Sequence, residues 1–167
     1  MPSSPTVSDL LNAIRSAIIA ADAETGERVY LTQRDEVSRE QFAEIFQGRV
    51  GQNPGINQTH AWIIEYKGVP ERREDEARDL YWIRHAFDLH LWYGPFNNDD
   101  ETALDAFQIG NAVADALEAD SSVFAMPEIT ERTITGIVPT VEHFSYALHH
   151  HVVLSLEITA TQFKVIA

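Results

Sequence analysis

Two long stretches of alternating side chains constrain the fold of this chain more than any other feature. Residues 80–93 carry large apolar side chains at almost every second position, and residues 148–158 repeat that pattern. A period of two is typical of a β-strand with one packed face and one face exposed to water. Strands of this length are expected to cross a whole sheet.

Two other segments have the three- and four-residue spacing of amphipathic helices. The first is predicted to begin at Ser8, whose hydroxyl can cap the first turn, and to end before Gly26. The second covers roughly residues 101–118 and is rich in alanine. Gly110 lies in its apolar stripe, which favours close packing of this helix on a sheet. A shorter helix is predicted after the capping-box sequence at residues 38–41.

The remaining segments are predicted from weaker patterns. Short strands are expected at residues 29–32, 61–66 and 129–135, and extended chain at 161–167. Loops or connections are expected at residues 48–58, 67–78 and 137–141. The segment 67–78 is dense in charges of both signs, so we interpret it as an exposed, mobile hairpin loop.

This order of elements defines an expected fold class. Helices separated by neighbouring antiparallel strands are typical of an α+β protein. We therefore predict a single domain over residues 1–167, with a mixed, mainly antiparallel twisted sheet and two main helices packed on one side.

The charge of the chain restricts its partners. Twelve basic residues stand against 26 acidic ones, a formal net charge of −14. Tight binding to nucleic acid requires clustered lysine and arginine, so it is not expected, although an acidic surface would let DNA pass without adhering. No apolar run approaches the roughly 20 residues that span a bilayer, so we expect no membrane contact. The absence of cysteine excludes disulfides and thiolate chemistry.

Three consecutive histidines raise the possibility of a metal site. Neighbouring strand residues point to opposite faces, so only His149 and His151 can converge, while His150 faces the core. Zinc usually takes three or four protein ligands, and a third would have to come from another segment. We therefore expect no metal and no cofactor, and interpret His149 and His151 as part of a water-exposed face or a subunit contact.

Asp88 and His90 share the polar face of the strand at 80–93 and could form an acid–base pair. The sequence holds no nucleophile elbow, no phosphate-binding glycine loop and no zinc-protease helix motif beside them. We therefore expect that the chain is not an enzyme.

Trp82 and Trp92 lie on the face opposite the apolar one, together with Arg84 and His90. A strand with large aromatic side chains on both faces is expected to be covered twice. The second cover could be a segment of the same chain, such as the first helix or residues 121–135. It could equally be a neighbouring subunit, because tryptophan and arginine are enriched at the centres of interfaces. Both explanations stay open.

Four segments together resemble the tail terminator, or tail-completion, proteins of long-tailed bacteriophages. They are the helix beginning near Asp9, the long strand ending at Tyr93, the alanine-rich helix and the closing strand that begins at His149. The likeness covers most of residues 8–160. It consists of the order of the elements and their general pattern of residue types, without a diagnostic motif. The segment 33–58 is longer than a minimal member of the family would need.

The resemblance implies a structural virion protein at the junction of tail and neck, assembled in the host cytoplasm. Its partners would be further copies of itself in a hexameric ring, the tail tube protein and a neck or head-completion protein, with DNA passing through the lumen. Trp82, Arg84, His90, Trp92, His149 and His151 are then interface candidates. Arg72, Arg73 and Arg78 would reach a partner from the charged loop, although a solvated hairpin without a role explains them as well.

Three other functions remain as alternatives. A head-completion or neck connector protein would share the particle and the ring. A small-molecule-binding or enzymatic α+β domain would use the aromatic face as a pocket. An acidic mimic of DNA would need its carboxylates on one surface, whereas here they are spread from Asp9 to Glu157.

Overall fold

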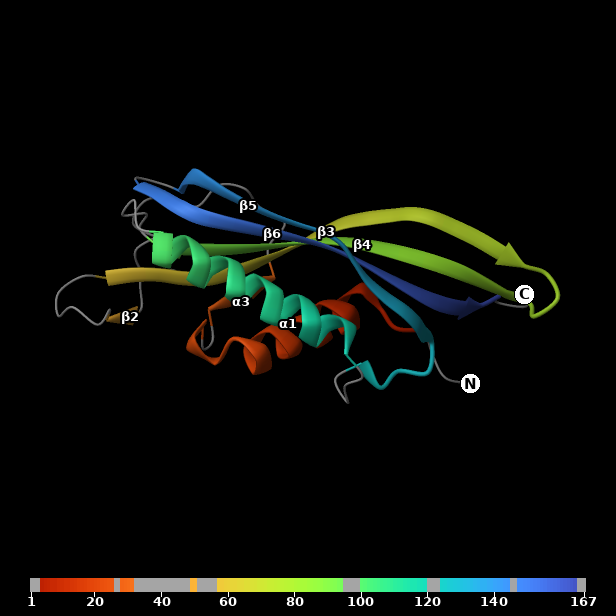
Figure 1. Cartoon of the computed structure of the whole chain (residues 1–167). Helices are drawn as coiled ribbons and strands as arrows, with labels where there is room; N and C mark the ends of the chain where they lie inside the picture. The colour runs from red at the N-terminus through yellow and green to blue at the C-terminus, as the bar shows by residue number, and fades with distance from the viewer. Residues whose placement is uncertain are drawn as a thin grey trace.

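In the residues that it describes, the computed structural model has two α-helices, one short 3-10 helix and a sheet (Figure 1). It describes residues 4–25, 28–31, 49–50, 57–94, 100–119, 124–144 and 147–164. The elements are α1 (Val7–Ala21), η1 (Ala23–Thr25), β1 (Val29–Leu31), β2 (Arg49–Val50), β3 (Asn57–Asp75), β4 (Leu80–Gly94), α3 (Asp100–Glu118), β5 (Ile129–Phe144) and β6 (Ala147–Phe163). No helix among these residues is both long enough and apolar enough to cross a bilayer.

The strands form a mixed, mainly antiparallel sheet. Their order is β1-β3-β4-β6-β5, with β2 paired to the beginning of β3. Among the described strands, only β1 runs parallel to its neighbour, whereas β3, β4, β6 and β5 are joined by antiparallel ladders. Helices α1 and α3 lie on one side of this sheet (Figure 1). The predicted α+β fold class, with two helices on one side of a mainly antiparallel sheet, is confirmed.

The core lies between the helices and the sheet. Its apolar side chains come from the buried stripes of both helices and from alternate positions of the strands. The largest fully buried ones are Trp62, Phe87, Leu10, Ile14, Ile18, Ile64, Leu89, Leu91, Leu117, Leu154 and Leu156. Gly110 brings α3 close to β6, because a Cβ atom at this position would lie 2.9 Å from Val152 Cγ1. The expectation that Gly110 marks a close approach to the sheet is confirmed.

The N-cap of the first helix lies two residues before the predicted one. Thr6 is the N-cap residue: its hydroxyl accepts a hydrogen bond from the Asp9 amide at 3.1 Å. The Asp9 carboxylate accepts in return from the Thr6 amide at 2.7 Å, which completes a capping box. The prediction that Ser8 caps this helix was therefore wrong, because Ser8 already lies inside the first turn.

The end of α1 is tied to the sheet by a buried polar group. Asp22 Oδ2 lies 2.6 Å from His60 Nε2 and accepts a hydrogen bond of 2.9 Å from Trp62 Nε1. All three residues are buried. Further along the same face, the Tyr66 hydroxyl lies 2.9 Å from His85 Nδ1. These contacts satisfy polar groups that would otherwise destabilise the core.

Among the described residues, strands lie within three segments that were predicted as loops or connections. Lys67–Asp75 is the second half of β3, and only residues 76–79 form the turn to β4. Residues 137–141 lie within β5, where Pro139 is tolerated on an edge strand. Arg49–Val50 is strand β2. The helix predicted after residues 38–41 lies outside the described residues.

These predictions failed because the segments lack the expected alternation. Residues 69–74 of β3 are exposed at every position, so charged side chains occupy both faces of the strand. A strand without a packed face shows no alternation of apolar and polar residues, so its sequence resembles that of a polar loop.

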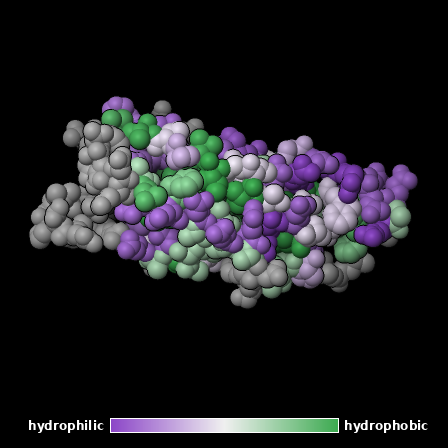
Figure 2. Space-filling model, in the orientation of Figure 1, coloured by the Kyte–Doolittle hydropathy of each residue, from purple (hydrophilic) through white to green (hydrophobic). Residues whose placement is uncertain are grey.

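The part of the β3–β4 hairpin next to its turn extends beyond the helices and forms an arm (Figure 1). We define the arm as residues 67–86 of this hairpin together with residues 159–163 of β6, which pair with the start of β4. Hydrophilic side chains gather on the arm in the space-filling view (Figure 2). The arm is thus a piece of sheet without a helix packed on it among the described elements.

Candidate functional site

The face of the sheet opposite α1 and α3 carries most of the residues that the sequence singled out. We call it the open face, because none of the described helices covers it (Figure 1). Strand β4 is central to it, with β3 on one side and β6 and β5 on the other. Alternate β4 positions therefore meet cross-strand partners from both directions, and two groups of side chains result.

The first group is a row of hydrogen-bonded side chains that crosses four strands. We call Glu65, His90, His151 and Glu142 the histidine row. Glu65 Oε2 lies 2.9 Å from His90 Nε2. His90 Nδ1 lies 2.9 Å from His151 Nε2, and His151 Nδ1 lies 2.7 Å from Glu142 Oε2. Every ring nitrogen of both histidines is thus within hydrogen-bonding distance of a neighbour.

These contacts set a requirement for positive charge. Each of the three contacts joins two atoms with lone pairs, so each needs one hydrogen between them. Two neutral imidazoles carry one N–H each and supply only two hydrogens. With both carboxylates ionised, the row is complete only when one further cation, a proton or another positive ion, binds to an imidazole nitrogen.

Burial indicates where in the row this cation belongs. His151 is only 7% exposed, and burial lowers its pKa despite the opposing hydrogen bond to Glu142. At Glu65, burial raises the pKa, but hydrogen bonds from His90 and Lys67 outweigh it and lower the pKa overall. Burial therefore disfavours the additional positive charge on His151.

Two neighbours fix the row in place. The Trp92 indole stacks on the His151 ring, with centroids 3.8 Å apart. The Ser155 hydroxyl donates a hydrogen bond of 3.3 Å to Asp88 Oδ1, beside His90.

Ligand atoms of Glu65, Asp88 and His90 all lie within 4.8 Å of one another, so these three could hold a metal ion.

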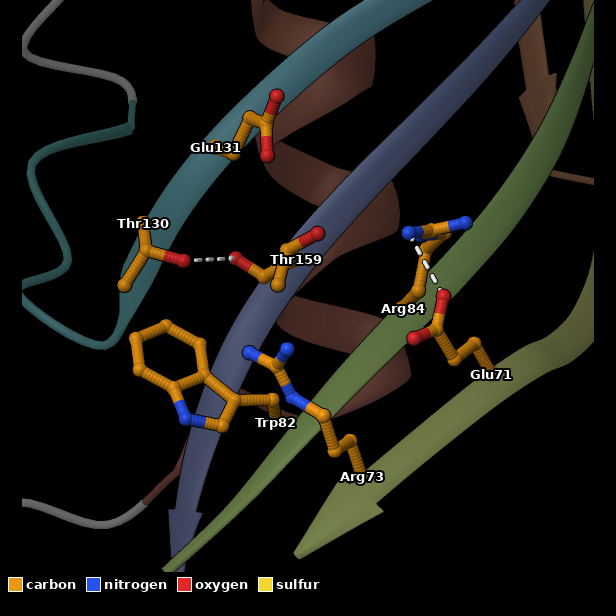
Figure 3. Close-up of a pocket in the computed structure, with 7 residues that line it drawn as sticks. All are labelled: Glu71, Arg73, Trp82, Arg84, Thr130, Glu131 and Thr159. Atoms are coloured by element: carbon orange, nitrogen blue, oxygen red, sulfur yellow. Dashed lines mark hydrogen bonds and ion pairs between the residues drawn. The ribbon is translucent and has the colours of Figure 1, made fainter. Parts of the chain in front are cut away.

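The second group surrounds Trp82 on the arm, close to the hairpin turn at residues 76–79 (Figure 3). A cavity of about 460 Å³, the Trp82 groove, is lined by Glu71, Arg73, Trp82, Arg84, Thr130, Glu131 and Thr159. The Arg73 guanidinium points toward the indole, 5.9 Å from its centroid. Arg84 is held by Glu71 at 2.7 Å and by Glu157 at 3.6 Å. The groove offers one flat aromatic surface among charges of both signs.

The interface residues predicted from the sequence fall into two sets. Those on the open face are Trp82, Arg84, His90, Trp92, His151 and Arg73. Two others are separated from it: Arg72 lies over the Tyr81 ring at 4.0 Å, and Arg78 lies in the hairpin turn. His149 shares the face of His151, two residues away on β6. His149 is fully buried, 3.0 Å from Thr59 Oγ1.

The interpretation of His149 and His151 as members of a water-exposed face was therefore wrong, because both are buried. His150 lies on the core side as expected and is also buried. The face opposite the helices is not uniformly exposed, since Trp92 covers His151.

Several residues of the site were missed by sequence reasoning. Glu65 and Glu142 contribute the two carboxylates of the histidine row, and Glu71 and Glu131 line the Trp82 groove. They lie on two strands, β3 and β5, that are distant in sequence. Their only sequence signal is a polar residue at an alternate position of a strand, which most exposed positions share.

Comparisons with known proteins add no family to this description. No protein-family model matches the chain. No curated protein matches its sequence either.

Proposed function

We propose that this chain is a structural subunit of a homo-oligomeric ring, with a hexamer as the expected form. The ring would cap the tail tube of a long-tailed bacteriophage, end tube polymerisation and join the tail to the head. The element order that resembles tail terminator proteins supports this function, and so does the α+β fold with its helices on one side.

The arm is the observation on which this proposal rests. Its two faces carry Tyr81 and Trp82, each with an arginine over the ring, at 4.0 Å for Arg72 and 5.9 Å for Arg73. Residues 69–74 are exposed along their whole length. A projecting ribbon of sheet gains little stability from its own chain where its side chains are exposed, as they are at residues 69–74. Such an element is explained when a neighbouring subunit covers it.

The open face has the composition of a subunit contact. Tryptophan and arginine are enriched at the centres of interfaces, and Trp82, Arg73 and Arg84 meet in one groove. The glutamates beside these arginines would favour one docking orientation over others. An arm that contacts the open face of the next copy forms a heterologous interface, which closes into a ring when the rotation per copy is right.

A ring of this kind works by assembly and requires no chemistry. Identical patches on one side of the ring would match the symmetric end of the tube and prevent addition of further tube subunits. The other side would bind the neck or head-completion protein. The net charge of −14 supports passage of DNA through the lumen, because carboxylates repel phosphate.

The decisive experiment is native mass spectrometry with negative-stain imaging, over a range of protein and salt concentrations and with and without purified tail tubes. The expected species contains about six chains and forms annuli, alone or on tube ends. Trp82→Ala should shift the population toward monomers, whereas Phe107→Ala, which removes another partly exposed aromatic ring from α3, should not. A monomer under all conditions, with no tube binding, would overturn the proposal.

The neck-connector alternative predicts a ring as well, so particle fractions separate the two functions. A tail terminator should be found with purified tails that lack heads. A neck connector should be found instead with filled heads that lack tails.

A further inference from the structure

We propose that the open face holds a divalent transition-metal ion between Glu65, Asp88 and His90. The site is independent of the ring proposal, since all three ligands belong to one chain. It differs from the metal hypothesis raised by the sequence, which was centred on His149 and His151 with a third ligand from another segment.

The three ligands converge because of the strand register. Glu65 of β3 and Asp88 of β4 are cross-strand partners, and His90 lies two residues further along the same face of β4. Their ligand atoms lie within 4.8 Å of one another. An ion with bonds of about 2.0–2.2 Å to nitrogen and oxygen needs ligand atoms separated by roughly 3–4.4 Å. Small side-chain rotations would bring the three atoms to that separation.

The histidine row provides the support that a ligating imidazole requires. Histidine ligands usually donate their second N–H to a fixed acceptor, which sets the ring orientation and raises the basicity of the ligating nitrogen. His90 Nδ1 lies 2.9 Å from His151 Nε2, and His151 Nδ1 lies 2.7 Å from Glu142. His90 can therefore donate from Nδ1 and present the lone pair of Nε2 to an ion.

The metal also supplies the cation that the row lacks. With an ion on His90 Nε2, two neutral imidazoles provide both hydrogens for the remaining two contacts. The direct contact between His90 and Glu65 is then replaced by binding of both side chains to the same ion.

The carboxylates are prepared for this role by their neighbours. Ser155 donates a hydrogen bond to Asp88 Oδ1 and so orients that side chain. Lys67 binds Glu65 through Oε1 at 3.2 Å, whereas Oε2 faces His90. One oxygen of Glu65 thus remains with the lysine while the other can bind the ion.

The ligand set selects the class of metal. One imidazole with two carboxylates suits Zn²⁺, Mn²⁺, Co²⁺ or Ni²⁺, whereas Mg²⁺ and Ca²⁺ prefer oxygen ligands alone. Three protein ligands leave at least one coordination position for water or for a side chain of a partner. A site of this kind on an open face could tie two molecules together through the metal.

The test is isothermal titration of the full chain with Zn²⁺, together with visible spectroscopy of the Co²⁺ form. We expect one ion per chain and a Co²⁺ spectrum that indicates nitrogen ligation. Asp88→Asn and Glu65→Gln should each weaken Zn²⁺ binding at least about tenfold. Both substitutions keep the side-chain shape, and circular dichroism would establish that each variant is folded before titration.

Two controls separate a defined site from general attraction by an acidic protein. Glu157→Gln removes one carboxylate from the same face, and His143→Gln removes an exposed imidazole. Neither should change the affinity by more than about twofold. The proposal is overturned if Zn²⁺ does not bind below about 1 mM, if the controls weaken binding as much as the ligand variants, or if folded ligand variants bind normally.

Discussion

Trp92 and His151 lie face to face across β4 and β6, with ring centroids 3.8 Å apart and ring planes 3° from parallel. The two residues are direct register partners in the ladder. The indole shields the imidazole on a face that no described helix covers, which leaves His151 only 7% exposed. The open face therefore contains its own small packed layer, built from aromatic rings.

The two tryptophans of the open face should differ in what they stabilise. Trp92→Leu is expected to lower the free energy of unfolding of the chain by about 1–3 kcal/mol, because it uncovers His151. Trp82→Leu should cost less than about 1 kcal/mol, since its ring faces the Trp82 groove. Urea unfolding followed by circular dichroism, at a concentration where the chain is monomeric, measures both values. Equal losses would contradict this division.

Asp22 should be among the most sensitive polar residues of the core. Asp22→Ala leaves the buried Trp62 indole N–H without an acceptor and is expected to cost about 2–4 kcal/mol. Asp22→Asn should cost less, because its amide oxygen can still accept this hydrogen bond. Asp105→Ala, at an exposed position of α3, provides the control. Thermal and urea unfolding of the three variants test the order.

The close approach of α3 to β6 predicts a coupled pair. Gly110→Ala would gain about 0.5–1 kcal/mol of helix stability but places a Cβ atom 2.9 Å from Val152 Cγ1. We expect a net loss of about 1–2 kcal/mol, because the branched valine is held by the strand. In a double-mutant cycle, adding Val152→Ala should recover at least about 1 kcal/mol relative to additivity. Additive losses would show that contact between the new Cβ atom and Val152 does not cause the destabilisation.

Stability should fall as the pH decreases below neutrality. Burial lowers the pKa of His85 from its ordinary value of 6.5, so the folded chain binds fewer protons there than the unfolded chain. The free energy of unfolding therefore decreases as pH falls below about 6.5, by up to about 1.4 kcal/mol per pH unit for each such histidine. Burial shifts the pKa values of His150 and His151 in the same direction.

The contribution of His85 can be isolated with His85→Gln. This variant should lose less stability than the wild type between pH 7 and pH 5, in urea titrations at about 0.5 M salt to screen the net charge. His143→Gln, at an exposed position, should follow the wild type. A slope unchanged by His85→Gln would exclude His85 as a source of the pH dependence.

The capping box of α1 gives a direct comparison of two neighbouring hydroxyls. Thr6→Ala removes the acceptor for the Asp9 amide and should cost about 0.5–2 kcal/mol. Ser8→Ala should be neutral or slightly stabilising, because Ser8 is exposed within the helix. Thermal melts of the two variants decide between the caps, and a larger loss for Ser8→Ala would support the cap predicted from the sequence.

The elements with one packed face could be predicted from the sequence. The helix near residues 101–118 and the strands near 80–93 and 148–158 carry a strong period because the core touches only one side of each. The second half of β3 has no packed side, so its residues were interpreted as a loop. A periodic pattern of apolar residues is present where one face of an element packs on the core. It is absent where a strand contacts only its neighbouring strands.

The histidine row could not be predicted for a different reason. His90 and His151 are 61 residues apart in the chain, and His90 and Glu65 are 25 apart. Their meeting depends on the register of three strands, and a shift of one residue would send each side chain to the other face. The sequence indicates which residues share a face of one strand, but not which strands are neighbours.

Strand β5 is an edge strand of the described sheet. Its irregular pairing affects whether a further strand can add to this edge. Its ladder with β6 is interrupted between Ile129 and Glu131 and again between Ile134 and Gly136, and Pro139 has no amide hydrogen to offer an incoming chain. A long uninterrupted border would recruit strand after strand into a fibre. This edge is instead expected to discourage the addition of further strands through backbone hydrogen bonds.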